Sequence, residues 1–170
     1  MEQFNKYLAI LVWSTLFWTS SPAMGQVDSN RAFLKSKGHW KVPISAYNKV
    51  LTDNQTKYCV GCTRIPGISF FGDSALPVLA VFDGKVISVL MIADMYGLVI
   101  RFGDYSIIYT GLSELRCQKG DKISAGQIIA DLNDQSGARN NEMDVMLADK
   151  KGRFFDPEKW FDWEKREPKR

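Results

Sequence analysis

Imidazole and thiolate side chains, which most zinc sites use, are few in this sequence and are scattered along it. Histidine occurs once, as His39, beside a tryptophan, where an imidazole is typical of a packing or surface residue. Glu142 and Asp144 stand two residues apart in an apolar run, so on a strand both carboxylates point to one face. Such a pair could bind a hard cation, or it could be an ordinary solvated strand edge. The sequence cannot supply the two or more imidazoles that a histidine-based zinc site uses.

Three cysteines are the other reactive side chains. Cys59 and Cys62 form a CxxC motif, and Cys117 lies much further along the chain. In an oxidising compartment we expect a structural disulfide between two of the three, and the spacing does not decide which two. Free thiols, or a metal or redox role, are the alternatives. A zinc site would need further ligands, and His39 is the one imidazole available.

The middle of the sequence predicts short strands, which would position these carboxylate and thiol side chains. Five runs are rich in β-branched and large apolar side chains: residues 78–82, 85–92, 98–102, 105–109 and 128–132. Asp83-Gly84 separates the first two runs and Gly103-Asp104 the next two, and such pairs tolerate the positive φ of a tight turn, which predicts two hairpins. Several runs are apolar on both faces, which is typical of strands covered on both sides.

This pattern predicts an all-β fold: a small antiparallel β-sandwich or barrel-sandwich hybrid with a short C-terminal helix. Asp156 as cap and Pro157 in the first turn predict that helix. Residues 29–37 favour a short helix, and residues 40–44 favour a short edge strand. A length of 170 residues suits one domain. We expect a polar lead-in at residues 26–63, a β domain at 64–161 and a charged tail at 162–170.

The first 25 residues have the features of a signal peptide. Lys6 supplies a basic start, and residues 7–18 form an apolar run shorter than the roughly 20 residues that cross a bilayer. Ala23 and Gly25 place small residues where a signal peptidase cuts. We therefore expect an exported chain, in the periplasm or at the cell surface, with no transmembrane segment after cleavage; an uncleaved anchor is the alternative. The net charge of +3 is scattered, which does not indicate a nucleic-acid partner.

Three segments resemble the LytM- or lysostaphin-type zinc peptidases, which cut peptide cross-bridges or stems in peptidoglycan. The segments are PVLAVFDGKVISV, YGLVIRFGDYSIIYTGLSELRCQKGDKISAGQIIADL and DPEKWF. The resemblance covers roughly residues 64–161, with the elements in the family's order. It implies the β-rich fold of that family, of the duplicated hybrid motif type.

The same resemblance shows what has changed at the site. The family uses a His-x-x-x-Asp element, a histidine on a middle strand and a His-x-His element on a later strand. In this sequence the corresponding residues are Ile65, Ser69, Gly111, Glu142 and Asp144. No histidine follows residue 39, so no alignment register supplies the imidazoles. The resemblance therefore implies a degenerate member with no catalytic residues, no metal and no cofactor. It also implies that these five residues line the groove in which active members bind their substrate.

This interpretation predicts a non-catalytic exported domain that binds peptidoglycan, a wall hydrolase or another envelope protein, in a regulatory or scaffold role. One alternative is an active zinc peptidoglycan endopeptidase whose atypical site uses Glu142, Asp144 and His39. Another is a biotinyl or lipoyl carrier, because GDKISAGQIIADL resembles half of that motif. In that reading Lys85 would carry the group, but it lacks the flanking methionine or acidic pair.

Overall fold

The computed structural model describes residues 23–52, 59–60, 63–73, 75–92, 94–133 and 141–163. The first element is helix α2 (Ala23–Lys35), and a single 3-10 turn (Glu158–Trp160) follows the last strand. The strands between them are β1 (Tyr47–Leu51), β2 (Cys59–Val60), β3 (Thr63–Arg64), β4 (Ile68–Gly72), β5 (Pro77–Leu79), β6 (Gly84–Ile92), β7 (Met95–Phe102), β8 (Tyr105–Ser113), β9 (Lys122–Ile123), β10 (Ile128–Leu132), β11 (Asn141–Asp149) and β12 (Phe154–Phe155). This confirms the all-β class.

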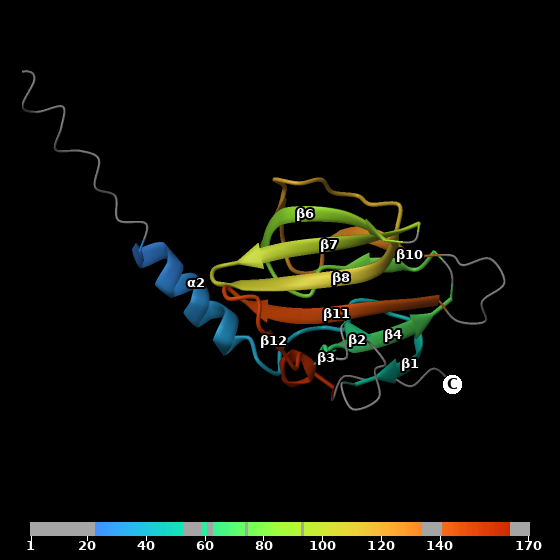
Figure 1. Cartoon of the computed structure of the whole chain (residues 1–170), viewed down its shortest axis with the longest axis horizontal. Coiled ribbons are helices and arrows are strands. Elements are labelled where there is room, and N and C mark those ends of the chain that lie inside the picture. Colours follow the sequence, from blue (N-terminus) through green and yellow to red (C-terminus); the bar gives the residue numbers. More distant parts are fainter. Residues whose placement is uncertain are drawn as a thin grey trace, which may run out of the picture.

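Most strands form one curled antiparallel sheet, which Figure 1 shows with α2 along one side. The strand order is β1-β4-β11-β8-β7-β6-β9, with β10 joining β5 to β8 and with β12 on the end of β11. The predicted hairpin around Gly103 is confirmed, since Phe102 of β7 pairs with Tyr105 of β8 and Gly103 has φ 60°. Glycine adopts that conformation at low cost, which is why the sequence could predict this turn.

The predicted hairpin around Asp83-Gly84 is wrong. Strand β5 pairs with β10, whereas β6 begins at Gly84 and pairs with β7 and β9. The backbone before the turn is bound elsewhere: Leu79 N donates to Pro43 O at 2.7 Å, and Ala80 N donates to Gln127 O at 2.9 Å. Long-range pairing thus overrides a local turn signal.

The predictions for the two ends of the chain are partly confirmed. Helix α2 covers most of the helix expected at 29–37, but it begins earlier and ends at Lys35, ahead of Gly38 with φ 76°. Residues 40–44 form no strand; Trp40 alone makes a parallel bridge, to Phe161. The C-terminal helix is one 3-10 turn whose N-cap residue is Pro157, not Asp156 as predicted; Asp156 Oδ1, just before it, accepts a 2.8 Å bond from Glu158 N.

The signal peptide and the other domain boundaries stay predictions. Residues 1–22 lie outside the described part of the chain, and α2 spans the expected cleavage position after Gly25. Among the described residues no helix combines the length and the apolar character needed to span a membrane.

An aromatic cluster fastens the helix and the C-terminal turn to the sheet. Phe33 of α2 is fully buried and stacks on Tyr105 of β8 with ring centroids 4.3 Å apart and planes 7° apart. Trp160 lies 5.7 Å from Phe33 and 6.1 Å from Trp40 between ring centroids. Burial of apolar surface is the main favourable term in folding and large rings bury much of it, so this cluster joins both ends of the domain to its core.

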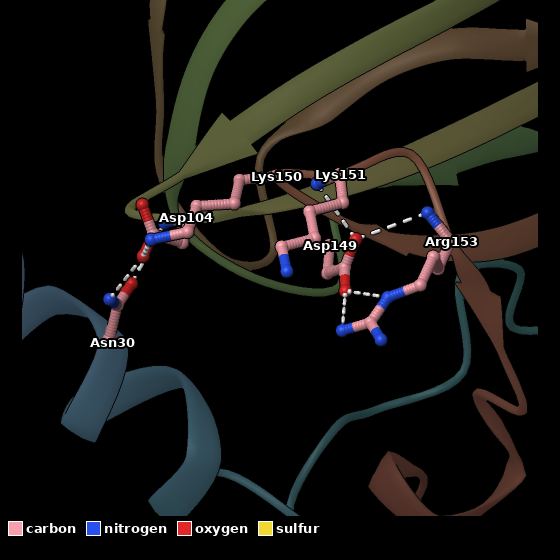
Figure 2. Close-up of polar contacts among 6 residues, drawn as sticks. All are labelled: Asn30, Asp104, Asp149, Lys150, Lys151 and Arg153. Atoms are coloured by element: carbon pink, nitrogen blue, oxygen red, sulfur yellow. Dashed lines mark hydrogen bonds and ion pairs between the residues drawn. The ribbon is translucent and has the colours of Figure 1, made fainter.

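A polar contact holds α2 at the same end of the domain, as Figure 2 shows. Asn30 Nδ2 donates to Asp104 Oδ2 at 3.0 Å, and Asp104 N donates to Asn30 Oδ1 at 2.8 Å. Lys150 forms a 3.0 Å ion pair with the same Asp104 oxygen. In the adjacent turn Arg153 pairs with Asp149, and this hydrogen bond is the largest of the effects that lower the pKa of Asp149.

We expect Asn30→Ala to lower the free energy of unfolding by about 1–2 kcal/mol, because Asp104 loses two partly buried hydrogen bonds. Asp28→Ala, at an exposed position of the same helix, is the matched control and should change stability by less than about 0.5 kcal/mol. Urea unfolding of the full chain measures both. Equal midpoints for the two variants would show that Asn30 does not fasten the helix.

Candidate functional site

The predicted site residues converge where β4, β11 and β8 lie side by side. Strand β11 is central, and Asp144 on it is directly opposite Ser69 of β4 on one side and Thr110 of β8 on the other. The three side chains stand in a row across the sheet. Ser69 and Asp144, which are hydrogen-bonded here, lie 75 residues apart in the chain.

Asp144 is the acceptor for both neighbours. Ser69 Oγ donates to Asp144 Oδ1 at 2.6 Å, and Thr110 Oγ1 donates to Asp144 Oδ2 at 2.8 Å. Ser69 and Asp144 are 1% and 4% exposed, so water has little access to this contact. Each carboxylate oxygen therefore has one hydroxyl donor, and the two bonds connect strands β4, β11 and β8. We call Ser69, Thr110 and Asp144 the carboxylate row.

The carboxylate row faces away from the hydrophobic core. Met143 and Val145, which flank Asp144, are fully buried core residues, so alternation turns Asp144 to the opposite face. Tyr109 beside Thr110 is also a fully buried core residue, and its hydroxyl accepts a 2.9 Å bond from Val81 N. Burial raises the pKa of Tyr109 far above its ordinary value, so this phenol is a neutral packing group.

The rest of this outer face is partly apolar. Glu142 shares the face of Asp144, is exposed and pairs with Phe71 of β4, while Met146 on the same face pairs with Ile108 of β8. Phe71, Ile108 and Met146 are half-buried. We call Phe71, Ile108, Glu142 and Met146, together with the carboxylate row, the outer face.

Gly111 does not present a side-chain position on the outer face. It is buried with φ 72°, and a Cβ built on it would collide with the backbone oxygen of Glu142. No side chain, histidine included, fits there without moving β11. The residue of this strand that reaches Asp144 is Thr110, which the sequence analysis did not single out. The register of β7 against β8 shifts between Tyr96 and Leu98, an irregularity that no sequence signal announces.

Ile65 lies just before β4, where it is half-buried. Its hydrocarbon side chain has no atom that can ligate a metal ion. In the structure Ser69, Glu142 and Asp144 share one face of the sheet, whereas Ile65 and Gly111 add no polar group to it.

The residues at these positions do not fit a zinc ion. Zinc in a hydrolase takes three imidazole, thiolate or carboxylate ligands and keeps a position for water. Here one carboxylate is present in the row, and both of its oxygens accept bonds from hydroxyls. Within the described residues, no three or more His, Cys, Asp or Glu side chains gather in a metal-binding group. His39 is exposed, and its backbone N–H bonds Ser36 O in the segment after α2.

Cys117 is the cysteine whose side chain the structure describes. Cys117 is a free thiol whose Sγ lies 3.7 Å from Ile129 O. Burial, and after it the charge of Asp121, raise the pKa of Cys117, which reduces its thiolate fraction at neutral pH. The side chains of Cys59 and Cys62 lie outside the described part of the chain, so the disulfide expected between two of the three cysteines stays a prediction.

Comparison with solved structures shows where this architecture recurs. Csd3 from Helicobacter pylori superposes with a TM-score of 0.57 and 16% identity, over 74% of this chain and 37% of that one. A zinc containing peptidase from Vibrio cholerae gives a TM-score of 0.55 and 23% identity, over 71% of this chain and 39% of that one. At these identities the likeness shows the fold, and the chain spans well under half of either protein.

A comparison with curated proteins gives no match. The sequence model of Peptidase family M23, however, matches residues 63–157, which is more than half of the 170 residues. Its limits nearly coincide with the β domain predicted from the sequence, and the resemblance to LytM- and lysostaphin-type proteins is confirmed. The chain belongs to peptidase family M23.

Proposed function

We propose that this chain is a non-catalytic M23 domain, exported to the periplasm or cell surface, whose outer face binds an extended peptide. The peptide belongs to peptidoglycan or to an envelope protein such as a wall hydrolase. The observation that carries the proposal is the carboxylate row: Ser69 and Asp144, at two positions that the resemblance aligns with metal ligands, bond each other at 2.6 Å. A hydrogen-bond set of this kind stabilises the sheet, and it contains no imidazole to hold a zinc ion and its water.

The composition of the outer face supports binding without catalysis. Half-buried apolar side chains at Phe71, Ile108 and Met146 supply contact area, and exposed Glu142 supplies charge at the edge. Peptide sites combine apolar contact area with a few placed polar groups in this way. A sugar-binding surface would need more exposed polar groups than this face provides. The peptide portion of the wall, or a peptide segment of a protein, is therefore the better fit.

The test uses the purified full chain and two ligands in parallel. Purified peptidoglycan in a sedimentation assay tests wall binding, and an envelope extract in a cross-linking assay identifies protein partners. Glu142→Arg should weaken whichever interaction is found at least fivefold, through reversed charge at the edge of the outer face. Lys151→Glu, an exposed charge change of the same size at the far end of β11, is the matched control and should leave it unchanged.

Two results would contradict the proposal. Release of peptide fragments from peptidoglycan by the purified chain would show that it is an enzyme. Binding that Glu142→Arg and Lys151→Glu reduce equally would show that the outer face is not the contact surface.

A further inference from the structure

Strand β6 has an open edge along most of its length. On one side it pairs with β7 from Lys85 to Ile92. On the other side β9 pairs with Gly84 and Lys85 alone, and Val86 then exchanges 2.9 Å bonds with the backbone of Asp121 and Gly120. Beyond Val86 no strand in the described residues pairs with this edge, and Figure 1 shows β6 on the outside of the β8, β7 and β6 group.

The unpaired backbone groups can be identified from the hairpin geometry. Ile92 pairs with Met95 across a two-residue turn, which makes them a hydrogen-bonded pair. Alternation then directs the N–H and C=O groups of Val89 and Met91 away from β7. These groups form a template that an added strand can satisfy.

The side chains at this edge are apolar on both faces of the strand. Leu90 is 46% exposed, Met91 70% and Tyr96 36%. Met91 is opposite Tyr96 and so shares its face, whereas Leu90, opposite Gly97, lies on the other. No charged residue occurs between Lys85 and Asp94, although edge strands of stable monomers usually carry charges that prevent pairing. The edge therefore has the character of an interface.

The charges at the two ends of the strand are opposite in sign. Lys85 is directly opposite Lys122 of β9, both are exposed, and neither forms an ion pair within the described part of the chain. Like charges in this position destabilise a sheet. Asp94, at the other end of β6, is also exposed and lacks an ion pair there. An antiparallel copy of the strand would bring the acidic end of one molecule to the basic end of the other.

We propose that β6 pairs with β6 of a second copy of this chain, antiparallel, around a two-fold axis at Leu90. Val89 of each copy then exchanges both backbone bonds with Met91 of the other. The same register places Ile92, the last residue of β6, opposite Ser88 of the other copy, so that Asp94 of each copy lies toward the Lys85–Lys122 end of the other. One surface serves both molecules, so the contact closes as a dimer and does not propagate.

Sedimentation velocity of the full chain over a wide concentration series tests the dimer. We expect a reversible monomer–dimer equilibrium that Leu90→Lys shifts to monomer, because the variant places two like charges together at the axis. Ile128→Lys is the matched control: Ile128 is 44% exposed on β10, and its variant should dimerise as the unchanged chain does. Melting curves of both variants establish that they are folded.

A second variant tests the charged ends. Asp94→Asn removes the charge while keeping a residue that tolerates the φ of 66° found there, and it should weaken the dimer several-fold. High salt should weaken the unchanged dimer similarly and affect Asp94→Asn much less. A chain that stays monomeric at every concentration overturns the proposal, as does a dimer that Leu90→Lys leaves intact. Capture of another protein's extended segment at this edge by a monomeric chain would equally overturn it.

Discussion

Trp160→Ala should lower the free energy of unfolding by about 3–5 kcal/mol, the range found when a buried aromatic side chain is removed from a core. Trp160 is 4% exposed, and its ring lies 5.3 Å from Phe155 and 5.7 Å from Phe33 between centroids. Its indole N–H also donates to Phe33 O at 3.4 Å. The substitution thus leaves a cavity between the C-terminal turn, helix α2 and the sheet.

Thermal unfolding of the full chain measures this effect. At about 2–4 °C for each kcal/mol in a chain of this size, the melting temperature should fall by roughly 6–20 °C. Trp163→Ala is the matched control, since Trp163 is half-buried and contacts Phe161 at the margin of the cluster; its effect should be less than half as large. A melting curve for Trp160→Ala that overlays that of the unchanged chain would mean that the C-terminal turn does not dock.

Asp144→Ala should destabilise the chain by about 2–5 kcal/mol, because two hydrogen bonds to a charged group are lost together. The substitution also leaves the buried Ser69 Oγ, between β4 and β11, without its acceptor. An unsatisfied buried hydroxyl adds a desolvation cost to the loss of the bond. A residue at a position that the resemblance aligns with a metal ligand is therefore expected to stabilise the fold.

Two further variants distinguish the loss of the side-chain hydrogen bonds from a general effect of substitution in β11. Ser69→Ala removes one donor and should have about half the effect of Asp144→Ala. Glu142→Ala, two residues along the same strand at an exposed position, should change stability by less than about 1 kcal/mol. Urea unfolding gives all three values. If Asp144→Ala were as mild as Glu142→Ala, the carboxylate row would have no structural role.

The fold was predictable where local chemistry decided the geometry. The Gly103 turn was read correctly because glycine supplies the positive φ that the hairpin requires. The Asp83-Gly84 turn has the same local signal, yet the partners of β5 and β6 lie far along the sequence, at β10 and β7. Pairing between distant segments depends on packing of the whole sheet, which a short window of sequence does not contain.

The site was predictable to a similar extent. The period of two along a strand put Glu142 and Asp144 on one face, and the family pattern brought Ser69 to them from another strand. Thr110 was not predicted as a site residue. The register of β7 against β8 shifts, which places Gly111, with its positive φ, where a side chain was expected. Threonine is also common in strands, so its presence there does not indicate a special role. Its role becomes visible only through the hydroxyl's 2.8 Å contact with Asp144.

The most direct test of the account is the zinc content of the purified full chain after incubation with zinc and removal of unbound metal, measured by mass spectrometry. The zinc containing peptidase from Vibrio cholerae serves as the positive control. We predict far less than one zinc ion per chain, because the carboxylate row leaves no three ligands for the ion. One tightly held zinc ion per chain, lost in Asp144→Ala, would contradict the account.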